Sequence, residues 1–123
     1  MSSELYEAGT AVRRAVLGDA HVDRSLSTAT EFSQPWQEYV TTAAWGQVWA
    51  REGLDRRTRS MLTVALLTAL RQENELALHV RGALRNGVTP DEIREVLLHT
   101  AVYAGVPATN AAFGVAERVV AGS

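Results

Sequence analysis

The sequence predicts an all-α fold of six or seven helices in a single domain that takes in residues 1–123. Apolar residues recur three and four positions apart along most of the chain, which is the spacing of one face of an α-helix. No stretch alternates convincingly between apolar and polar residues, as a half-buried strand would. Glycine and proline separate the periodic segments with short linkers. Helices that are adjacent in sequence are therefore expected to pack as antiparallel neighbours.

Three helices are expected in the first half of the chain. Residues 3–17 carry apolar side chains at helical spacing, and residues 18–21 then form a turn that begins with glycine. A second helix is expected over residues 22–32. Pro35 suits the first turn of a third helix over residues 35–50, because proline has no amide hydrogen to lose there.

Two further helices are expected to form a pair in the middle of the chain. Asp55 can cap a helix over residues 56–71, where an aspartate side chain can accept a hydrogen bond from the exposed amides. Residues 61–70 are apolar on nearly every helical face, so this segment is expected to lie in the interior. The next helix covers residues 73–86 and is followed by Gly87, a favourable residue just beyond a helix end.

The last two helices have clear start signals. Thr89 can serve as N-cap, Pro90 as the first helical residue and Glu92 as the third, which together predict a helix that runs to about Tyr103. A glycine then interrupts the pattern, and a proline opens a final helix over residues 107–120.

Composition excludes several classes of function. The formal net charge of −2 indicates neither nucleic acid nor an anionic membrane as a partner. The absence of cysteine excludes a disulfide framework, a thiolate metal site and CxxC redox chemistry. All 12 basic residues are arginine, which captures carboxylates through two parallel hydrogen bonds better than lysine does. The hydrophobic content of 46% leaves apolar helix faces that need partners, so a homo-oligomer is expected.

The sequence also predicts a cytoplasmic protein without a membrane segment. The first residues lack a basic region followed by an apolar run, so no signal peptide is expected. The apolar run over residues 61–70 is far shorter than the roughly 20 residues that span a bilayer.

Glu75 and His79 are the candidate catalytic residues. They are four positions apart on the helix over residues 73–86, so their side chains share one face, which Gly82 and Asn86 extend. The same spacing is common in solvated acid–histidine pairs, and the spacing alone favours that interpretation. The pair could also supply two metal ligands, but no third ligand is marked, so no metal site is expected.

The remaining unusual residues have structural interpretations. His99 is expected to be a packed or rim residue, and His21 to lie in a turn. Trp45 and Trp49, four apart, are expected first in the core or a subunit interface and only second in a pocket wall. Arginines at positions 56, 57 and 59 are expected first to form a solvated helix start, and their opposition to the helix dipole there hints weakly at another use.

Several blocks of the chain resemble one known family. In order, they read VLGDAHV, AWG, GLDRRTRS, ELALHVR, ALRNG and YAGVP, over residues 16–22, 44–46, 53–60, 75–81, 83–87 and 103–107. Together they resemble the carboxymuconolactone decarboxylase family of the β-ketoadipate pathway, from about residue 5 to residue 120. The resemblance implies an alkylhydroperoxidase D-like fold, with all-α subunits in ring-shaped homo-oligomers, trimers or hexamers. Peroxidase relatives carry CxxC and a histidine, and Glu75 stands here at the second cysteine position, so peroxidase chemistry is excluded.

The resemblance also implies a reaction. It is the cofactor-free decarboxylation of 4-carboxymuconolactone, a lactone dicarboxylate, to the β-ketoadipate enol-lactone in protocatechuate catabolism. His79 would donate the proton or stabilise the oxyanion, and Glu75 would orient the imidazole or favour its charged form. Other residues would form walls or hold a carboxylate of the substrate: Trp45, Trp49, Tyr103, Arg71 and Arg81.

Three alternatives stay open. The chain could be a decarboxylase or isomerase of a related lactone or β-keto-like acid, because pocket walls rather than the motif select the substrate. It could be a non-catalytic subunit of a helical assembly. It could also be an enzyme with a bound metal.

Overall fold

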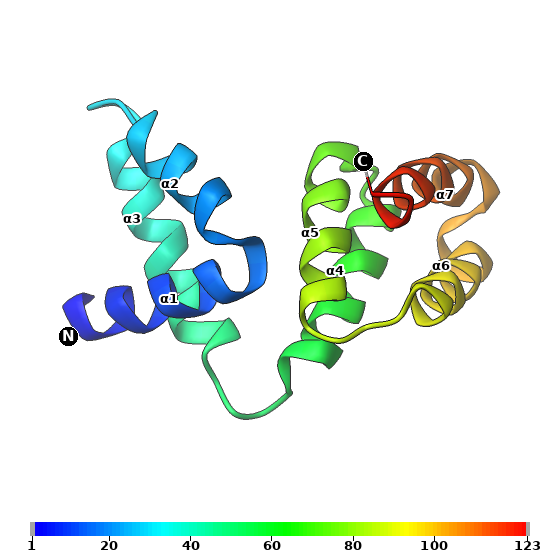
Figure 1. Cartoon of the computed structure of the whole chain (residues 1–123), viewed down its shortest axis with the longest axis horizontal. Helices are drawn as coiled ribbons and strands as arrows, with labels where there is room; N and C mark the ends of the chain where they lie inside the picture. The colour runs from blue at the N-terminus through cyan, green and yellow to red at the C-terminus, as the bar shows by residue number, and fades with distance from the viewer. Residues whose placement is uncertain (1, 123) are drawn as a thin grey trace. The chain divides into compact units, whose positions relative to one another are not determined.

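The computed structural model describes residues 2–122, with side chains described from Glu4 to Gly122. These residues form seven α-helices and one π-helix without any strand, which confirms the all-α prediction. Contacts divide the chain into two compact units, Met1–Leu54 and Asp55–Ser123, and each is described by itself (Figure 1). The single domain over residues 1–123 stays a prediction, and its two terminal positions lie outside the described residues.

Unit 1 consists of four helical segments, which are α1 (Ser2–Leu17), α2 (Asp19–Ser27), α3 (Gln34–Val40) and the π-helix η1 (Thr41–Trp49). The first confirms the helix predicted over residues 3–17. The predicted turn over residues 18–21 is wrong. Gly18, with φ 89°, is the single residue between the two helices, and α2 starts at the next residue. Arg14 supports this start by donating a hydrogen bond to Asp19, with Nη1 and Oδ1 3.1 Å apart.

The second predicted helix also ends earlier than expected, at Ser27 rather than at residue 32. Thr30 and Ser33 lie just beyond and bind each other's backbone. The amide of Thr30 donates to Ser33 Oγ over 2.8 Å, and the amide of Ser33 donates to Thr30 Oγ1 over 3.3 Å. Such side-chain acceptors give the backbone an alternative to helical hydrogen bonds, which explains the early end.

The helix predicted over residues 35–50 is one α-helix followed by one π-helix. Along η1 the backbone of α1 crosses in direct contact. A Cβ atom on Gly9 would lie 2.1 Å from the carbonyl oxygen of Thr41, and one on Gly46 would lie 2.4 Å from that of Leu5. Only glycine allows this approach, so the crossing depends on both glycines.

The two predicted tryptophans lie on one face of the π-helix. Its hydrogen bonds span five residues instead of four, and residues four apart share a face as they do in an α-helix. The ring centroids of Trp45 and Trp49 are 4.9 Å apart, with a tilt of 30° between the rings. Trp45 is buried, as the core interpretation predicted, whereas Trp49 is half-buried.

Unit 2 consists of four α-helices, which are α4 (Arg56–Ala69), α5 (Glu73–Arg85), α6 (Pro90–Ala104) and α7 (Val106–Val120). The predicted helices over residues 56–71, 73–86, 90–103 and 107–120 are confirmed to within two residues. Their inward faces form one apolar core to which all four contribute, including Val64, Leu76, Leu97 and Val115. Within this unit α5 packs against α4 and α7, while α6 packs against the same two helices.

One expectation for α4 is wrong. The segment over residues 61–70 is not buried on every face. Val64 and Thr68 are buried, but Leu62, Leu66 and Leu70 are 50%, 61% and 64% exposed. The three leucines lie four residues apart on one outward stripe, because only the opposite side of α4 meets the core. Among residues 2–122, no helix is both long and apolar enough to cross a membrane.

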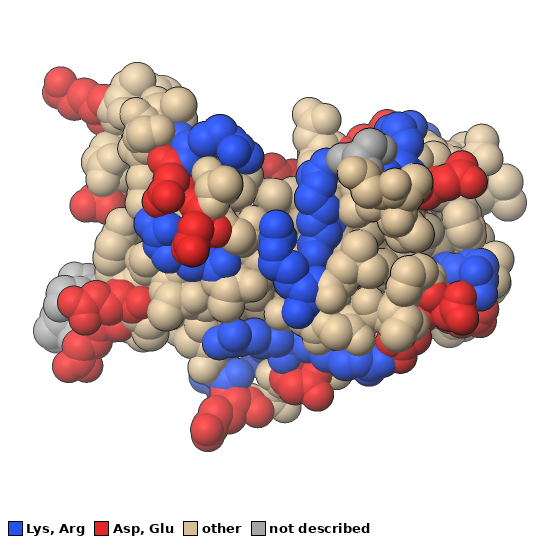
Figure 2. All heavy atoms as spheres, viewed as in Figure 1, with Lys and Arg blue, Asp and Glu red and all other residues tan. Residues whose placement is uncertain are grey.

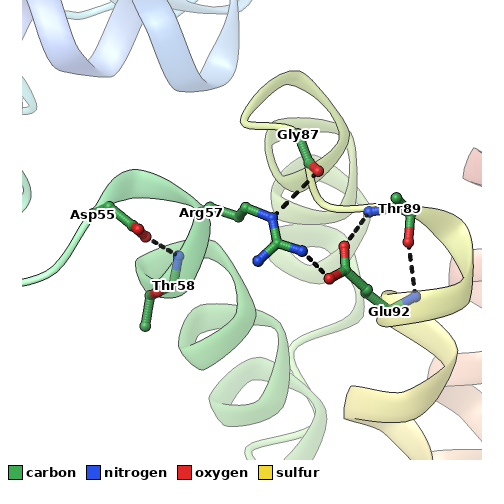
Figure 3. A network of polar contacts seen from close by, with 6 residues as sticks. All are labelled: Asp55, Arg57, Thr58, Gly87, Thr89 and Glu92. Atoms are coloured by element: carbon green, nitrogen blue, oxygen red, sulfur yellow. Dashed lines mark hydrogen bonds and ion pairs between the residues drawn. The ribbon is translucent and has the colours of Figure 1, made fainter.

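The predicted caps of α4 and α6 are both present (Figure 3). The carboxylate of Asp55 accepts a hydrogen bond from the amide of Thr58 over 2.7 Å, and this bond lowers the pKa of Asp55 below its ordinary value. At α6, Thr89 Oγ1 accepts from the amide of Glu92 over 3.1 Å, and Glu92 Oε1 accepts from the amide of Thr89 over 2.9 Å. This is the reciprocal capping box that the sequence predicted.

Candidate active site

The candidate site lies on the hairpin of α4 and α5, which run side by side in unit 2 (Figure 1). A tight turn at residues 70–72 joins them. The amide of Arg71 donates to the carbonyl of Thr68 over 3.1 Å, and that of Gln72 donates to Leu67 over 3.0 Å. This pattern ends α4 and requires a left-handed residue, which is Arg71 with φ 58°. The turn makes the two helices antiparallel and brings their flanks together.

Helix α5 has two different sides near the site. Leu76, Val80 and Ala83 lie in the apolar core of unit 2. Glu75 and His79 lie on the flank beside that core stripe, because residues four apart share a helix face. Gly82 and Asn86 follow three and seven positions after His79, so they extend the same flank, as predicted.

A hydrogen bond identifies what this flank of α5 meets. Asn86 Nδ2 donates to Ser60 Oγ of α4 over 2.9 Å, and Ser60 is fully buried. His79 lies two turns before Asn86, so its imidazole also lies at the seam with α4, and it is only 8% exposed. Glu75 is exposed at the edge of the seam. The arrangement therefore combines a buried imidazole with a carboxylate that water and ligands can reach.

Sequence reasoning missed Ser60, although a signal was present. Ser60, Val64 and Thr68 are spaced by four residues along α4, and all three are buried. Ser60 and Thr68 stand at the two ends of this buried stripe. A buried hydroxyl needs a hydrogen-bond partner, so such residues indicate a polar side chain on the neighbouring helix. Asn86, which helical spacing places on the same flank as His79, is the partner of the Ser60 hydroxyl.

The two arginines predicted to anchor the substrate occupy different positions. Both are exposed. Arg71 lies in the turn before α5, four residues before Glu75. Arg81 is two residues beyond His79, which places it about 200° around the helix and therefore on the opposite side of α5. Of the two, only Arg71 lies at an end of the flank that carries the pair.

The aromatic residues predicted as walls belong to both units. Trp45 and Trp49 belong to unit 1. Tyr103 lies at the end of α6, is 80% exposed and pairs with the ring of His99 at a centroid distance of 5.3 Å. Within unit 2, Tyr103 therefore belongs to the face formed by α4 and α6.

The other histidines have structural positions. His99 lies on the rim of a largely apolar groove of about 460 Å³ between α4 and α6, as the rim interpretation predicted. His21 is not in a turn but in α2, where its ring lies 3.5 Å from Ser25 Oγ. Over the described part of the chain, no three acidic or histidine side chains are grouped closely enough to hold a metal ion.

Basic side chains are unevenly distributed over unit 2. In the space-filling view they gather over α5 and over the start of α4 in unit 2 (Figure 2). Acidic side chains predominate elsewhere on the drawn face, so the small net charge hides an uneven distribution. The two arginines of α5, Arg81 and Arg85, follow His79 by two and six residues, so they lie on the opposite side of that helix from the candidate pair.

Comparison with known proteins identifies the family. A model of the carboxymuconolactone decarboxylase family matches residues 34–118. The 4-carboxymuconolactone decarboxylase of Acinetobacter baylyi is 50% identical over 114 residues, which cover 93% of this chain and 85% of that protein. The nitrosuccinic acid decarboxylase of Metarhizium robertsii is 47% identical over 116 residues, or 94% of this chain and 81% of that protein. A 4-carboxymuconolactone decarboxylase of Pseudomonas putida is 56% identical over 41 residues, covering 33% of this chain and 85% of that sequence. The resemblance seen in the sequence blocks is thus confirmed, and the chain belongs to the carboxymuconolactone decarboxylase family.

Proposed function

We propose that the chain is a lyase that removes CO2 from 4-carboxymuconolactone without a cofactor and releases the enol-lactone of β-ketoadipate. The observation that carries this proposal is a buried imidazole, that of His79, four residues along one helix face from the exposed carboxylate of Glu75. The pair occurs in a chain that is 50% identical to a 4-carboxymuconolactone decarboxylase over 93% of its length.

The substrate can accept its own electrons. It is a butenolide whose γ carbon carries a carboxylate and an acetate arm. When the bond from the γ carbon to the carboxylate breaks, the electron pair moves through the ring double bond to the lactone carbonyl oxygen. Protonation of the resulting dienolate at the α carbon gives the enol-lactone. The protein therefore needs to bind the acetate carboxylate, stabilise the dienolate and supply one proton.

His79 is the proposed proton donor or oxyanion partner. An imidazole can exist in both protonation states near neutral pH, which suits either role. Its burial supports this role, because a water-poor surface would disfavour the charged carboxylate relative to neutral CO2. Glu75 would orient the imidazole or favour its charged form from the edge of the seam.

The other proposed roles concern binding. Arg71 and Arg81 are candidate anchors for a carboxylate, because a guanidinium can hold both carboxylate oxygens at once. Trp45, Trp49 and Tyr103 are candidate apolar walls. The position of Arg71 at the start of α5 supports it more than Arg81, which lies on the opposite side of that helix.

Similarity to a second enzyme supports a second candidate substrate. The chain is 47% identical to a nitrosuccinic acid decarboxylase over 94% of its length. Nitrosuccinic acid carries one carboxylate on the carbon that bears the nitro group and another on a methylene arm. Loss of the first carboxylate leaves its electrons on the nitro group, so this molecule also contains its own electron acceptor. Both candidate substrates thus share an acetate arm and a self-contained acceptor.

A direct assay distinguishes the two candidates. Purified protein is incubated with 4-carboxymuconolactone or with nitrosuccinate, with and without EDTA, and CO2 and the organic products are measured. We expect a kcat/KM for the lactone at least tenfold above that for nitrosuccinate, unchanged by EDTA. A preference for nitrosuccinate would replace the first function by the second. Turnover of neither would support a non-catalytic role, and loss of activity with EDTA would support a metal enzyme.

The proposed assembly is a cytoplasmic homo-oligomer, either a trimer or a hexamer. The outward stripe of Leu62, Leu66 and Leu70 supports it, because monomers rarely expose contiguous large apolar residues. Light scattering coupled to gel filtration gives the mass directly. A monomer at micromolar concentration would contradict the proposal.

A further inference from the structure

Arg13 is a charged side chain buried inside unit 1. It lies in α1 and is only 7% exposed. Its Nη1 atom donates to Gln37 Oε1 over 3.1 Å and to Thr41 Oγ1 over 3.2 Å. Burial of a guanidinium costs free energy unless its donors are hydrogen-bonded, so such a residue indicates a specific task. Gln37 lies in the last turn of α3 and Thr41 is the first residue of η1, so the task concerns the junction of these two helices.

Arg13 and Gly9 contact the same turn of η1 from α1 (Figure 1). They are four residues apart, so they share a face of α1. A Cβ atom on Gly9 would lie 2.1 Å from the carbonyl oxygen of Thr41 and 2.8 Å from the amide nitrogen of Gly46. Thr41 and Gly46 are five residues apart, which is the separation that π-helical hydrogen bonds join. Gly9 thus lies against the first turn of η1, and Arg13 binds the first residue of that turn.

Two contacts fix the register of η1 against α1. At one end, a Cβ atom on Gly46 would lie 2.4 Å from the carbonyl oxygen of Leu5, so only glycine fits there. At the other end, about two turns further along α1, Arg13 binds the hydroxyl of Thr41. A shift of η1 by one residue would separate Arg13 from this hydroxyl and bring a larger side chain against the backbone of Leu5. The crossing therefore allows a single register.

This register also sets the direction of two aromatic rings. Thr41 is followed at intervals of four residues by Trp45 and Trp49, so all three lie on one stripe of η1. The indole centroids are 4.9 Å apart, and the ring of Trp45 is buried. The amide of Ala50 donates to the carbonyl of Trp45 over 3.0 Å, which is a five-residue bond of the π-helical type. Arg13 binds the first residue of the stripe and so acts on the rings through the backbone of η1.

We infer that Arg13 is a positioning residue, which holds η1 in its π-helical register and thereby orients Trp45 and Trp49 as a wall for the substrate. This inference rests on the proposed function, in which the two tryptophans are candidate walls. Arg13 would act without touching the substrate, because its guanidinium is buried and bound to α3 and η1. π-Helical turns are rare and are found frequently at functional sites, which gives a reason for a side chain from another helix to secure this one.

The test measures the electronic coupling of the two indole rings. Two indoles in contact give a paired band in ultraviolet circular dichroism. Because the chain has three tryptophans, Trp36→Phe leaves only the pair and serves as the background for every variant. Adding Trp49→Phe removes the pair and gives the signal without coupling. Arg13→Met should reduce the band towards that signal. It should also raise KM for 4-carboxymuconolactone about three- to tenfold with kcat within about twofold, because a wall contacts ground state and transition state alike.

Three further variants complete the test. Thr41→Val removes the hydroxyl that Arg13 binds and should reduce the band, whereas Thr41→Ser keeps a hydroxyl and should restore it. Arg14→Met is the matched control, since Arg14 is the next residue of α1 and pairs with Asp19 and Asp23 at 3.1 Å and 2.8 Å. It should keep the band and the KM of the background protein. If Arg13→Met loses its helical dichroism, the two Thr41 variants decide the question.

The outcomes separate this inference from the proposed function. No CO2 from the lactone with wild-type protein would overturn the proposed function and, with it, the effect on the substrate. Normal turnover together with an unchanged band in Arg13→Met and Thr41→Val would overturn only the role of Arg13. A lost band with an unchanged KM would also overturn that role, because the direction of the rings would then not matter to the substrate.

Discussion

The crossing of α1 with η1 in unit 1 and the α4–α5 hairpin in unit 2 are both close helix pairs, but they are built differently. In unit 1 the backbones touch through Gly9 and Gly46, with no room for a single methyl group. In unit 2 side chains separate the helices, and the seam between them includes a serine, an asparagine and His79. A contact made by backbone alone can only stabilise the fold, whereas polar side chains between two helices can also bind a substrate and take part in its reaction.

The largest expected effect concerns the hairpin. His79→Ala should lower kcat for decarboxylation about 100- to 10,000-fold, the usual contribution of a positioned proton donor, while circular dichroism stays helical. Steady-state kinetics of CO2 release measures this effect. A variant with near wild-type rate would remove His79 from the mechanism.

The next effect breaks the crossing in unit 1. Gly9→Ala would place a methyl group 2.1 Å from the carbonyl oxygen of Thr41, so the helices must separate. Alanine normally favours a helix over glycine by up to about 1 kcal/mol, but overpacking costs about 1–3 kcal/mol and should dominate. We expect a lower free energy of unfolding in urea and an altered near-ultraviolet dichroism of the tryptophans.

Gly53→Ala is the control for this substitution, because a methyl group there meets nothing within 4 Å. Its free energy of unfolding should be unchanged or raised by up to about 1 kcal/mol. Equal stability of the Gly9 and Gly53 variants would show that the crossing relaxes easily.

A moderate effect is expected at the capping box of unit 2. Thr89→Ala removes the acceptor of the Glu92 amide and should lower the free energy of unfolding by about 1 kcal/mol. Thr89→Ser keeps the hydroxyl oxygen and should retain most of the stability. If the alanine and serine variants unfold at the same urea concentration, the hydroxyl makes no net contribution.

Glu75→Gln should change the rate less than removal of the imidazole does. A carboxylate next to an imidazole favours its protonated form, so the neutral amide should move the pH–rate profile to lower pH. We expect a change in kcat of about two- to tenfold near neutral pH. A profile that coincides with that of the wild type would assign Glu75 a structural role.

The smallest effect is a pH dependence of stability at the start of α4. The amide of Thr58 lowers the pKa of Asp55, so this carboxylate contributes stability above its ordinary pKa of about 4. The contribution is lost as the pH falls through the lowered pKa of the folded state. Asp55→Asn keeps a cap that does not titrate. The free energy of unfolding of the wild type should therefore fall relative to that of the variant as the pH is lowered from about 5 to about 2. A constant difference would contradict the assignment.

Most helix boundaries and the candidate pair could be predicted from the sequence. Local signals explain this success, because Asp55, Thr89 and Gly87 act on amides and carbonyls within a few residues of themselves. Glu75 and His79 share a face of α5 for the same reason, since helical spacing is a local property. Their function, in contrast, stays a proposal that rests on family membership and on the burial of one member.

The features that could not be predicted all depend on which residues meet across the fold. The π-helix arises where α1 crosses, and nothing within residues 41–49 alone indicates it. Nothing in the apolar run of α4 indicates which of its sides is exposed. That side is defined only by where α5 and α6 pack against the helix. The hydrogen bond between Arg57 of α4 and Glu92 of α6, and that between Asn86 of α5 and Ser60 of α4, join residues far apart in the sequence. Short-range hydrogen bonding thus determines where helices begin and end, while long-range packing decides which side chains share a seam.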